Sequence, residues 1–248
     1  MSGSVGKGDE AEGVTTMRST IAAVFTLLAT IAAPVQAQTN PVVVELYTSQ
    51  GCSSCPPADA LLAELAKRDD VIPLALHVDY WDYIGWKDEH ASPQFTMRQK
   101  AYARAAGHRT IYTPQMIVGG RDHVVGYKPM QLAQLISDHQ DASRTVEVSA
   151  TRQGNSVVIR ARAVTKGTGM MMVHLVRYTP SDTVQIGRGE NAGKTITYTN
   201  IVTGWTDLGG WNGAAPLELR AEFKGDAPAV VLLQKTGHDP IVAAARVR

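Results

Sequence analysis

The sequence predicts an α/β domain of order β-α-β-α-β-β-α, followed by an all-β domain with a sandwich-like arrangement. Up to residue 140, apolar strand patterns alternate with amphipathic helix patterns. After residue 141 only short, alternating or β-branched runs occur, separated by glycine-containing turns. With 248 residues, 44% of them hydrophobic, the chain has enough apolar material for one large domain or two modest ones.

The elements of the first domain can be placed in order. A β-branched run after Pro41 predicts the first strand, and the next strand is almost wholly apolar, as expected of a central position. Leu61, Leu62 and Leu65 form the apolar stripe of the first helix, and Gly107 ends the second helix. The expected strands are 42–47, 71–78, 113–118 and 122–126, and the expected helices are 57–67, 93–106 and 129–139.

The second domain is predicted as seven strands with no helix. Turn residues at 153–155, 209–210 and 237–240 separate the runs. Several short strands with such spacing are typical of a sandwich. The expected strands are 145–150, 156–164, 170–178, 195–202, 217–223, 229–234 and 241–247.

The N-terminal segment has the layout of a secretory signal peptide. Arg18 precedes an apolar run at 21–33, and Val35-Gln36-Ala37 offers a small-x-small cleavage pattern. A membrane span needs roughly 20 apolar residues, so this run is short for one, although an uncleaved anchor is the alternative. We therefore expect an upstream extension at 1–16, a signal peptide at 17–37, and mature domains at 38–140 and 141–248, with no membrane span after cleavage.

Two cysteines, Cys52 and Cys55, are the only ones in the chain and form a C-x-x-C motif at the first strand-to-helix turn. A disulfide between them closes a very small loop and so restrains the unfolded chain little. A helix start stabilises a thiolate, which is the attacking species in disulfide exchange. We expect Cys52 to lie where the helix begins and to attack, and Cys55, one turn into the helix, to be more buried and to resolve. An inert structural bridge is the alternative.

Residues 42–139 resemble a thioredoxin-superfamily domain, because the element order fits, the C-x-x-C follows the first strand, and Thr113-Pro114 opens the third. The resemblance implies that Pro114 is cis and faces the disulfide, and that the Thr113 backbone pairs with a substrate peptide. A narrower resemblance is to exported proteins described as domain of unknown function 1223. It is carried by 45–59, by 77–82 and by Gly189-Glu190-Asn191-Ala192-Gly193.

Two positions depart from the thioredoxin pattern. Many members keep a buried acid six residues before the first cysteine, where this chain has Leu46; Glu45 is one residue earlier, on the opposite strand face. We therefore treat Glu45 as a supporting residue only. The pair between the cysteines is Ser-Ser, and Ser54 is expected to hydrogen-bond a Cys52 thiolate.

An aromatic loop at 80–86 follows the second strand and should leave the sheet at the same edge as Cys52. Trp81 and Tyr83 are therefore candidate substrate-binding residues, although simple packing of the loop is the alternative. The stretch from His90 to Arg121 contains no acidic residue. Its positive charges could favour a nearby thiolate, or they could simply form a solvated basic helix face. Its basic residues are Arg98, Lys100, Arg104, Arg109 and Arg121.

Other chemistries receive less support from the sequence. His77 and Asp79 share a strand face, but a metal site needs three or four placed ligands, so no metal site and no cofactor are predicted. Residues 189–195 resemble a phosphate loop but lack the glycine required at position 188, which is Arg188, and lie between strands, so a turn is expected. The net charge of +1 gives no reason to expect nucleic-acid binding.

The sequence thus predicts an exported, periplasmic or secreted thiol–disulfide oxidoreductase. Its partners would be protein or small-molecule thiols and disulfides, with a redox partner in the envelope. The alternative is a non-catalytic envelope module that is redox-regulated or carries a metal.

Overall fold

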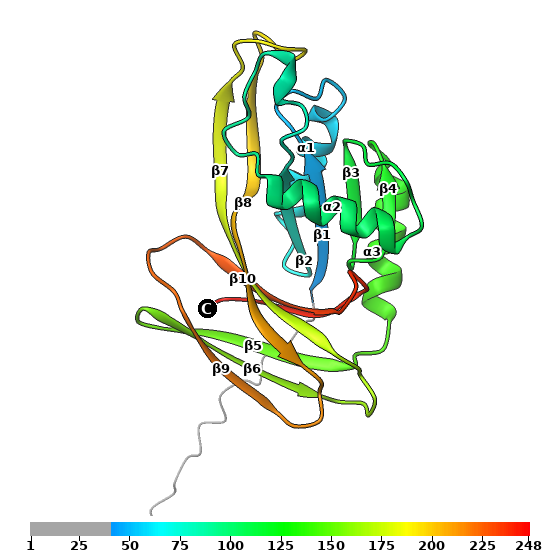
Figure 1. Ribbon diagram of the computed structural model, residues 1–248, viewed down its shortest axis with the longest axis vertical. Coiled ribbons are helices and arrows are strands. Elements are labelled where there is room, and N and C mark those ends of the chain that lie inside the picture. Colours follow the sequence, from blue (N-terminus) through cyan, green and yellow to red (C-terminus); the bar gives the residue numbers. More distant parts are fainter. Residues whose placement is uncertain (1–40) are drawn as a thin grey trace, which may run out of the picture. The chain divides into compact units, whose positions relative to one another are not determined.

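The α/β elements expected up to residue 140 are present in the computed structural model, in the predicted order (Figure 1). The structure describes residues 41–248, so the expected extension and signal peptide lie outside the described residues. Helix α1 starts one residue before its predicted position and α3 starts at its predicted position. Each has proline in its first turn, where the missing N–H group would have no partner within the helix. The elements are β1 (Val42–Thr48), α1 (Pro56–Leu65), β2 (Val71–His77), a 3-10 turn (Asp82–Ile84), α2 (Pro93–Ala105), β3 (Gln115–Val118), β4 (Asp122–Val125) and α3 (Pro129–Asp141).

The seven later strands are also present, but two are much longer than predicted. They are β5 (Val146–Gln153), β6 (Ser156–Ala163), β7 (Met171–Gln185), β8 (Thr195–Trp211), β9 (Leu217–Glu222), β10 (Ala229–Lys235) and β11 (Ile241–Arg246). Gly209 and Gly210, expected to form a turn, lie inside β8 and pair with Val173 and Met172. The register shifts beside Val173, and a bulge of this kind accommodates glycine within a strand.

The strands form one large mixed sheet and one small antiparallel sheet. The large sheet has the order β11-β10-β7-β8-β2-β1-β3-β4, and the small sheet has the order β5-β6-β9. Strands β1 and β2 are parallel, and β2 joins β8 in parallel through Ala75 and Ile201. Four strands of the C-terminal half therefore extend the sheet of the α/β part.

This arrangement corrects the expectation of a self-contained C-terminal sandwich. The small sheet does pack on β7, β10 and β11, as in a sandwich, but the facing sheet continues into the α/β part. Residues 41–248 lie within one compact unit. A boundary between folding units at residue 140 stays a prediction, while the sheet itself runs across that position.

Alternation along the strands assigns each face of the large sheet to a different core. In β1, Val44 and Leu46 pack with α1 and α3, whereas Val43 and Tyr47 pack on the α2 side. In Figure 1, α2 crosses the near face of β1 and β2. Strand β1 is buried on both faces along its whole length, so packing on both sides fixes the position of its C-terminal end, which leads into the cysteines.

Candidate functional site

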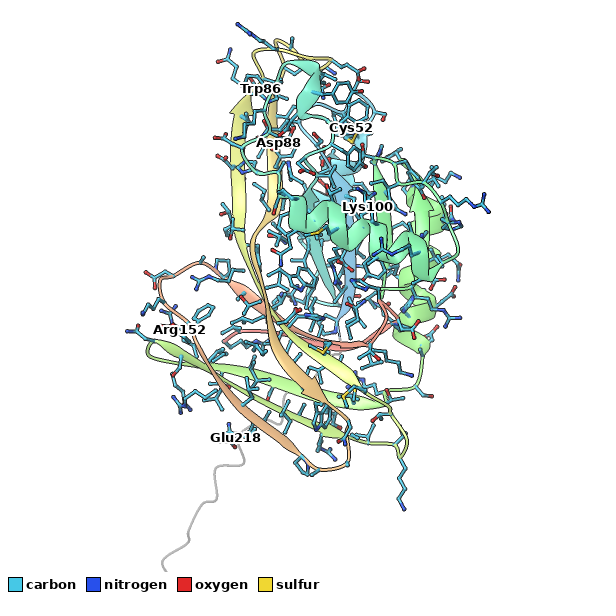
Figure 2. All side chains as sticks on the ribbon, in the orientation of Figure 1. Cys52, Trp86, Asp88, Lys100, Arg152 and Glu218 are labelled. Carbon is cyan, nitrogen blue, oxygen red and sulfur yellow. A yellow bond between two sulfur atoms is a disulfide. The ribbon has the colours of Figure 1, made fainter. Side chains whose placement is uncertain are left out.

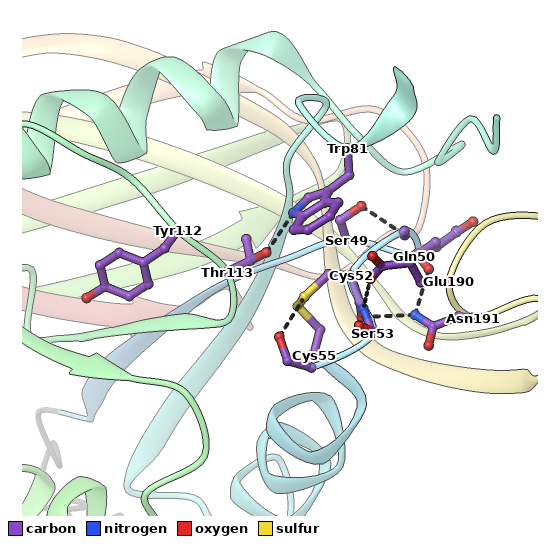
Figure 3. Close-up of a disulfide and its surroundings, with 12 residues drawn as sticks. Ser49, Gln50, Cys52, Ser53, Cys55, Trp81, Tyr112, Thr113, Glu190 and Asn191 are labelled. Atoms are coloured by element: carbon purple, nitrogen blue, oxygen red, sulfur yellow. Dashed lines mark hydrogen bonds between the residues drawn. A yellow bond between two sulfur atoms is a disulfide. The ribbon is translucent and has the colours of Figure 1, made fainter. Parts of the chain in front are cut away.

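Cys52 and Cys55 form a disulfide at the end of β1, with their Cα atoms 5.4 Å apart (Figure 3). The pairing of the two cysteines is therefore confirmed. Both are buried, at 1% and 0% exposure, whereas Ser53 and Ser54 between them are exposed. The Ser54 hydroxyl lies 3.4 Å from Cys52 Sγ. A disulfide is typical of an oxidising setting outside the cytoplasm.

The position of the helix start differs from the prediction. Helix α1 begins at Pro56, and Cys55 is its N-cap residue, so Cys55 and not Cys52 borders the helix. Cys52 lies in the preceding turn, where its N–H donates to the Ser49 carbonyl at 3.1 Å. The two prolines after Cys55 occupy the first turn of α1, which begins one residue before the predicted start at Pro57. Cys55, predicted to be the more buried of the two, is 0% exposed against 1% for Cys52, so both are almost fully covered.

Trp81 and Thr113 lie together beside the disulfide, as Figure 3 shows. The Trp81 indole N–H donates to the Thr113 hydroxyl at 2.8 Å. The Thr113–Pro114 peptide bond is cis, as the resemblance implied, and Pro114 is buried. Tyr83, in contrast, is 82% exposed, so its side chain faces solvent. The structure thus joins Trp81 and Thr113 at the cysteines but places Tyr83 on the surface.

The rest of the aromatic loop supports the turn that carries the cysteines. The Trp86 indole N–H donates to the Gln50 side chain at 2.7 Å, and the Gln50 N–H donates to Asp88 at 2.8 Å. Asp88 also contacts His77 Nδ1 at 2.7 Å. Burial raises the pKa of Asp88, but the hydrogen bond and charge of His77 outweigh that effect and hold it below the usual value. Figure 2 shows Trp86, Asp88 and Cys52 in the same region of the molecule.

The tip of the β7–β8 hairpin, residues 186–194, contacts the cysteine turn from the C-terminal half. The buried Asn191 amide donates to the carbonyls of Gln50 and Cys52, both at 2.9 Å. Glu190 accepts from the Ser53 N–H at 3.3 Å. As predicted, this segment is a turn between strands. Sequence reasoning did not assign Asn191 to the site, because 139 residues separate it from Cys52; the family-like motif at 189–193 was the available signal.

Replacing Asn191 by alanine is expected to lower the free energy of unfolding by about 2 kcal/mol, since two buried carbonyls lose their donor. The same change should let dithiothreitol reduce the disulfide faster. Urea unfolding and reduction kinetics measure the two effects. The exposed Asn155, replaced in the same way, is the control and should change stability by less than about 0.5 kcal/mol. An equally small effect at Asn191 would contradict the assigned role of the hairpin tip.

Glu45 and the basic stretch contact each other instead of the cysteines. Buried Glu45 accepts from Arg98 Nε at 2.7 Å and from the Tyr102 hydroxyl at 2.6 Å, both on α2. The Arg98 guanidinium also stacks on Trp205, 3.8 Å from the ring centre. The remaining basic residues of the stretch are exposed: Lys100, Arg104, Arg109 and Arg121. In the basic stretch, Arg98 therefore forms a buried ion pair with Glu45, and the other basic residues face solvent.

Among residues 41–248, neither the group of possible metal ligands nor the cavity beside α2 includes the cysteines. Asp79 contacts the Thr96 hydroxyl at 2.5 Å, whereas His77 is paired with Asp88. The grouping of possible ligand atoms within 4.8 Å found among residues 41–248 is Glu89, His90 and Asp182. A cavity of about 360 Å³ lies between α2 and the β7, β8 and β10 strands, and no cysteine lines it.

The fold and site define a mixed α/β protein with a buried C-x-x-C disulfide between its first strand and first helix. The chain belongs to the family described as protein of unknown function (DUF1223), whose model matches residues 43–234. It is similar to a protein from Agrobacterium tumefaciens whose X-ray crystal structure is known. The two share 36% sequence identity with a TM-score of 0.71, over 83% of this chain and 92% of that one. No curated protein matches the chain.

No helix within residues 41–248 is long and apolar enough to cross a membrane.

Proposed function

We propose that the protein is an exported thiol–disulfide oxidoreductase of the thioredoxin type, acting in the periplasm or as a secreted protein. The observation that carries the proposal is the disulfide itself: a bridge between residues three apart, at the β1–α1 junction, beside Trp81 and Thr113. A bridge over so small a loop adds little to stability, which favours a chemical role. The order β1-α1-β2-α2-β3-β4-α3, with Pro114 next to β3, supports the resemblance to the thioredoxin superfamily.

In this proposal the Cys52 thiolate of the reduced protein attacks a substrate disulfide, and one substrate thiolate leaves. Cys55 then attacks Cys52 Sγ, the intramolecular disulfide re-forms, and the second substrate thiolate leaves. The substrate is reduced by two electrons and the protein is oxidised. The reverse sequence donates a disulfide. The Thr113 backbone and Trp81 are proposed to contact the substrate chain, and a thiol partner in the envelope would restore the starting redox state.

Burial of the cysteines sets a condition on this function. Because Cys52 is only 1% exposed, a partner reaches its sulfur only after a covering group moves. Trp81 is the candidate, since a single side-chain hydrogen bond to Thr113 holds its indole nitrogen.

Exchange between the protein and glutathione, followed by mass spectrometry, tests the proposal. The wild type should exchange, Cys52→Ser should abolish exchange, and Cys55→Ser should accumulate a mixed disulfide on Cys52. Undiminished exchange in Cys52→Ser would overturn the proposal.

The second candidate is a non-catalytic, redox-regulated module. It is favoured by the burial of both cysteines and by the contacts of Asn191 and Glu190 with the cysteine turn, through which reduction would alter the hairpin tip. If this candidate is right, the reduced protein should exchange with glutathione no faster than the same protein does when it is reduced and denatured. A metal-carrying role would require the reduced protein to bind Zn(II) or Cu(I) stoichiometrically and to lose the metal in Cys55→Ala.

A further inference from the structure

Asp59 carries an unpartnered carboxylate in a buried position close to Cys55. It belongs to α1, where its N–H donates to the Cys55 carbonyl at 3.1 Å. Residues four apart are neighbours on a helix surface, and helical side chains lean towards the N-terminus. From this position in the helix we expect the Asp59 side chain to lean towards Cys55. It is 5% exposed, and neither of its oxygens has a hydrogen-bond partner in the structure.

The surroundings of Asp59 are polar and equally unpartnered. The other buried side-chain atoms without a hydrogen bond include the Thr48 hydroxyl on β1, His77 Nε2 on β2 and the Tyr198 hydroxyl on β8. The His77 and Tyr198 rings are in edge contact at 4.8 Å. Helix α1 packs against both β2 and β8, which brings these groups to its buried side. An unpaired buried carboxyl is costly, so its presence here needs a chemical reason.

The charges around Asp59 come from each element packed against it. His77 from β2 favours the carboxylate, whereas Asp88 from the loop after β2 disfavours it. Burial raises the pKa of Tyr198 on β8, and the negative charges of Asp59 and Asp88 raise it further. Burial dominates for Asp59 and raises its pKa to about 7, and two groups act in the opposite direction: the charge of His77 and the Thr48 hydroxyl, which is close but makes no well-formed hydrogen bond to the carboxyl. At neutral pH this carboxyl can therefore both accept and release a proton.

Cys55 needs such a partner if it resolves a mixed disulfide. Cys55 is fully buried in the disulfide form, so in the same fold the proton of its thiol could not pass directly to solvent. Glu45 does not fit, because its oxygens are occupied by Arg98 and Tyr102 on the α2 side of β1. Glu190 is exposed and contacts the Ser53 N–H. Asp59 combines burial, a free pair of oxygens and a place one helical turn from Cys55.

We propose that the Asp59 carboxylate takes the proton of the Cys55 thiol when Cys55 resolves a mixed disulfide on Cys52, a role that rests on the proposed function. The S–H proton moves to Asp59, and the Cys55 thiolate attacks Cys52 Sγ. The Cys52–Cys55 bond forms, the bond from Cys52 to the substrate sulfur breaks, and the substrate thiolate leaves with the electron pair. In the reverse direction the protonated carboxyl returns its proton to the Cys55 thiolate.

The test follows the two steps separately in the reduced, full-length protein, with oxidised glutathione as the probe. Mass spectrometry gives the rate at which glutathione attaches to Cys52 and the rate at which Cys55 releases it. Asp59→Asn should slow release by about tenfold or more at pH 7 and leave attachment nearly unchanged. Raising the pH to about 9.5, above the usual pKa of a thiol, should restore release. Glu64→Gln, an exposed acid on the same helix, is the matched control.

The outcomes distinguish failure of the role proposed for Asp59 from failure of the proposed thiol–disulfide exchange. A wild-type release rate that rises with a midpoint near pH 7, and an Asp59→Asn rate without that midpoint, would support the role of Asp59. Equal release rates in both proteins would overturn it, and slow release that persists at about pH 9.5 would assign Asp59 a purely structural role. If glutathione never attaches to Cys52 of the wild type, the proposed function itself fails.

Discussion

Replacing Arg98 by methionine is expected to lower the free energy of unfolding by about 3–5 kcal/mol. The change leaves the Glu45 carboxylate buried without its cationic partner, and a broken buried ion pair costs far more than an absent one. Arg98 also donates to Tyr102 and Gln234, so two further buried groups lose a partner. Urea unfolding at neutral pH, with the disulfide intact, measures the loss.

Two further variants show whether the loss comes from the buried charge. Arg104→Met removes an exposed arginine from the same helix and should change stability by less than about 0.5 kcal/mol. Combining Glu45→Gln with Arg98→Met removes both charges and should recover part of the loss. A single Arg98→Met variant as stable as the wild type would contradict the buried ion pair.

Asp59 is expected to make a large contribution to the pH dependence of stability between about pH 4 and 7. This contribution is opposite in sign to that of the histidines whose pKa values are lowered by burial, His123, His174 and His238. The pKa of Asp59 is raised from 3.8 to about 7 by burial, so over this range the folded protein holds a proton that the unfolded chain has released. The Asp59 contribution to the free energy of unfolding should therefore fall as the pH rises from about 4 to 7, and stay level above that. A shift of about three units corresponds to at most about 4 kcal/mol.

Asp59→Asn should remove this contribution and leave that of the histidines, so the variant gains stability relative to the wild type as the pH rises from about 4 to 7. Asp70→Asn is the control, because the Arg68 hydrogen bond holds the Asp70 pKa at about 2 and its titration lies below this window. Urea unfolding at a series of pH values distinguishes the two. A slope that is unchanged in Asp59→Asn would contradict an ionisable carboxyl buried without a partner.

The sequence was sufficient for the features that depend on local chemistry. Periodicity placed the helices and strands up to residue 140, because proline and glycine mark their ends within a few residues. The cysteine spacing alone indicated the disulfide. The alternation of β1 also predicted that Glu45 and Leu46 face opposite sides, as they do.

Features that depend on distant partners could not be predicted. Pro180 and the polar residues around it hid the second half of β7, which is stable because it pairs with β8. Asn191 and Cys52 meet only because that long hairpin reaches the cysteine turn. Arg98 looked like part of a basic surface until the fold placed it against Glu45. Asp59 resembled any acid in a first helical turn, because only the packing of α1 against β2 and β8 reveals its burial.

The reduction potential of the Cys52–Cys55 pair tests the central claim most directly. Purified protein would be equilibrated with glutathione buffers, with dithiothreitol buffers for the lowest potentials, and the oxidised fraction measured by mass spectrometry. The account predicts a value between about −120 and −270 mV, the range of disulfide oxidants, isomerases and thioredoxin-like reductants. A value below about −300 mV would identify a structural bridge and contradict the assignment of thiol–disulfide exchange.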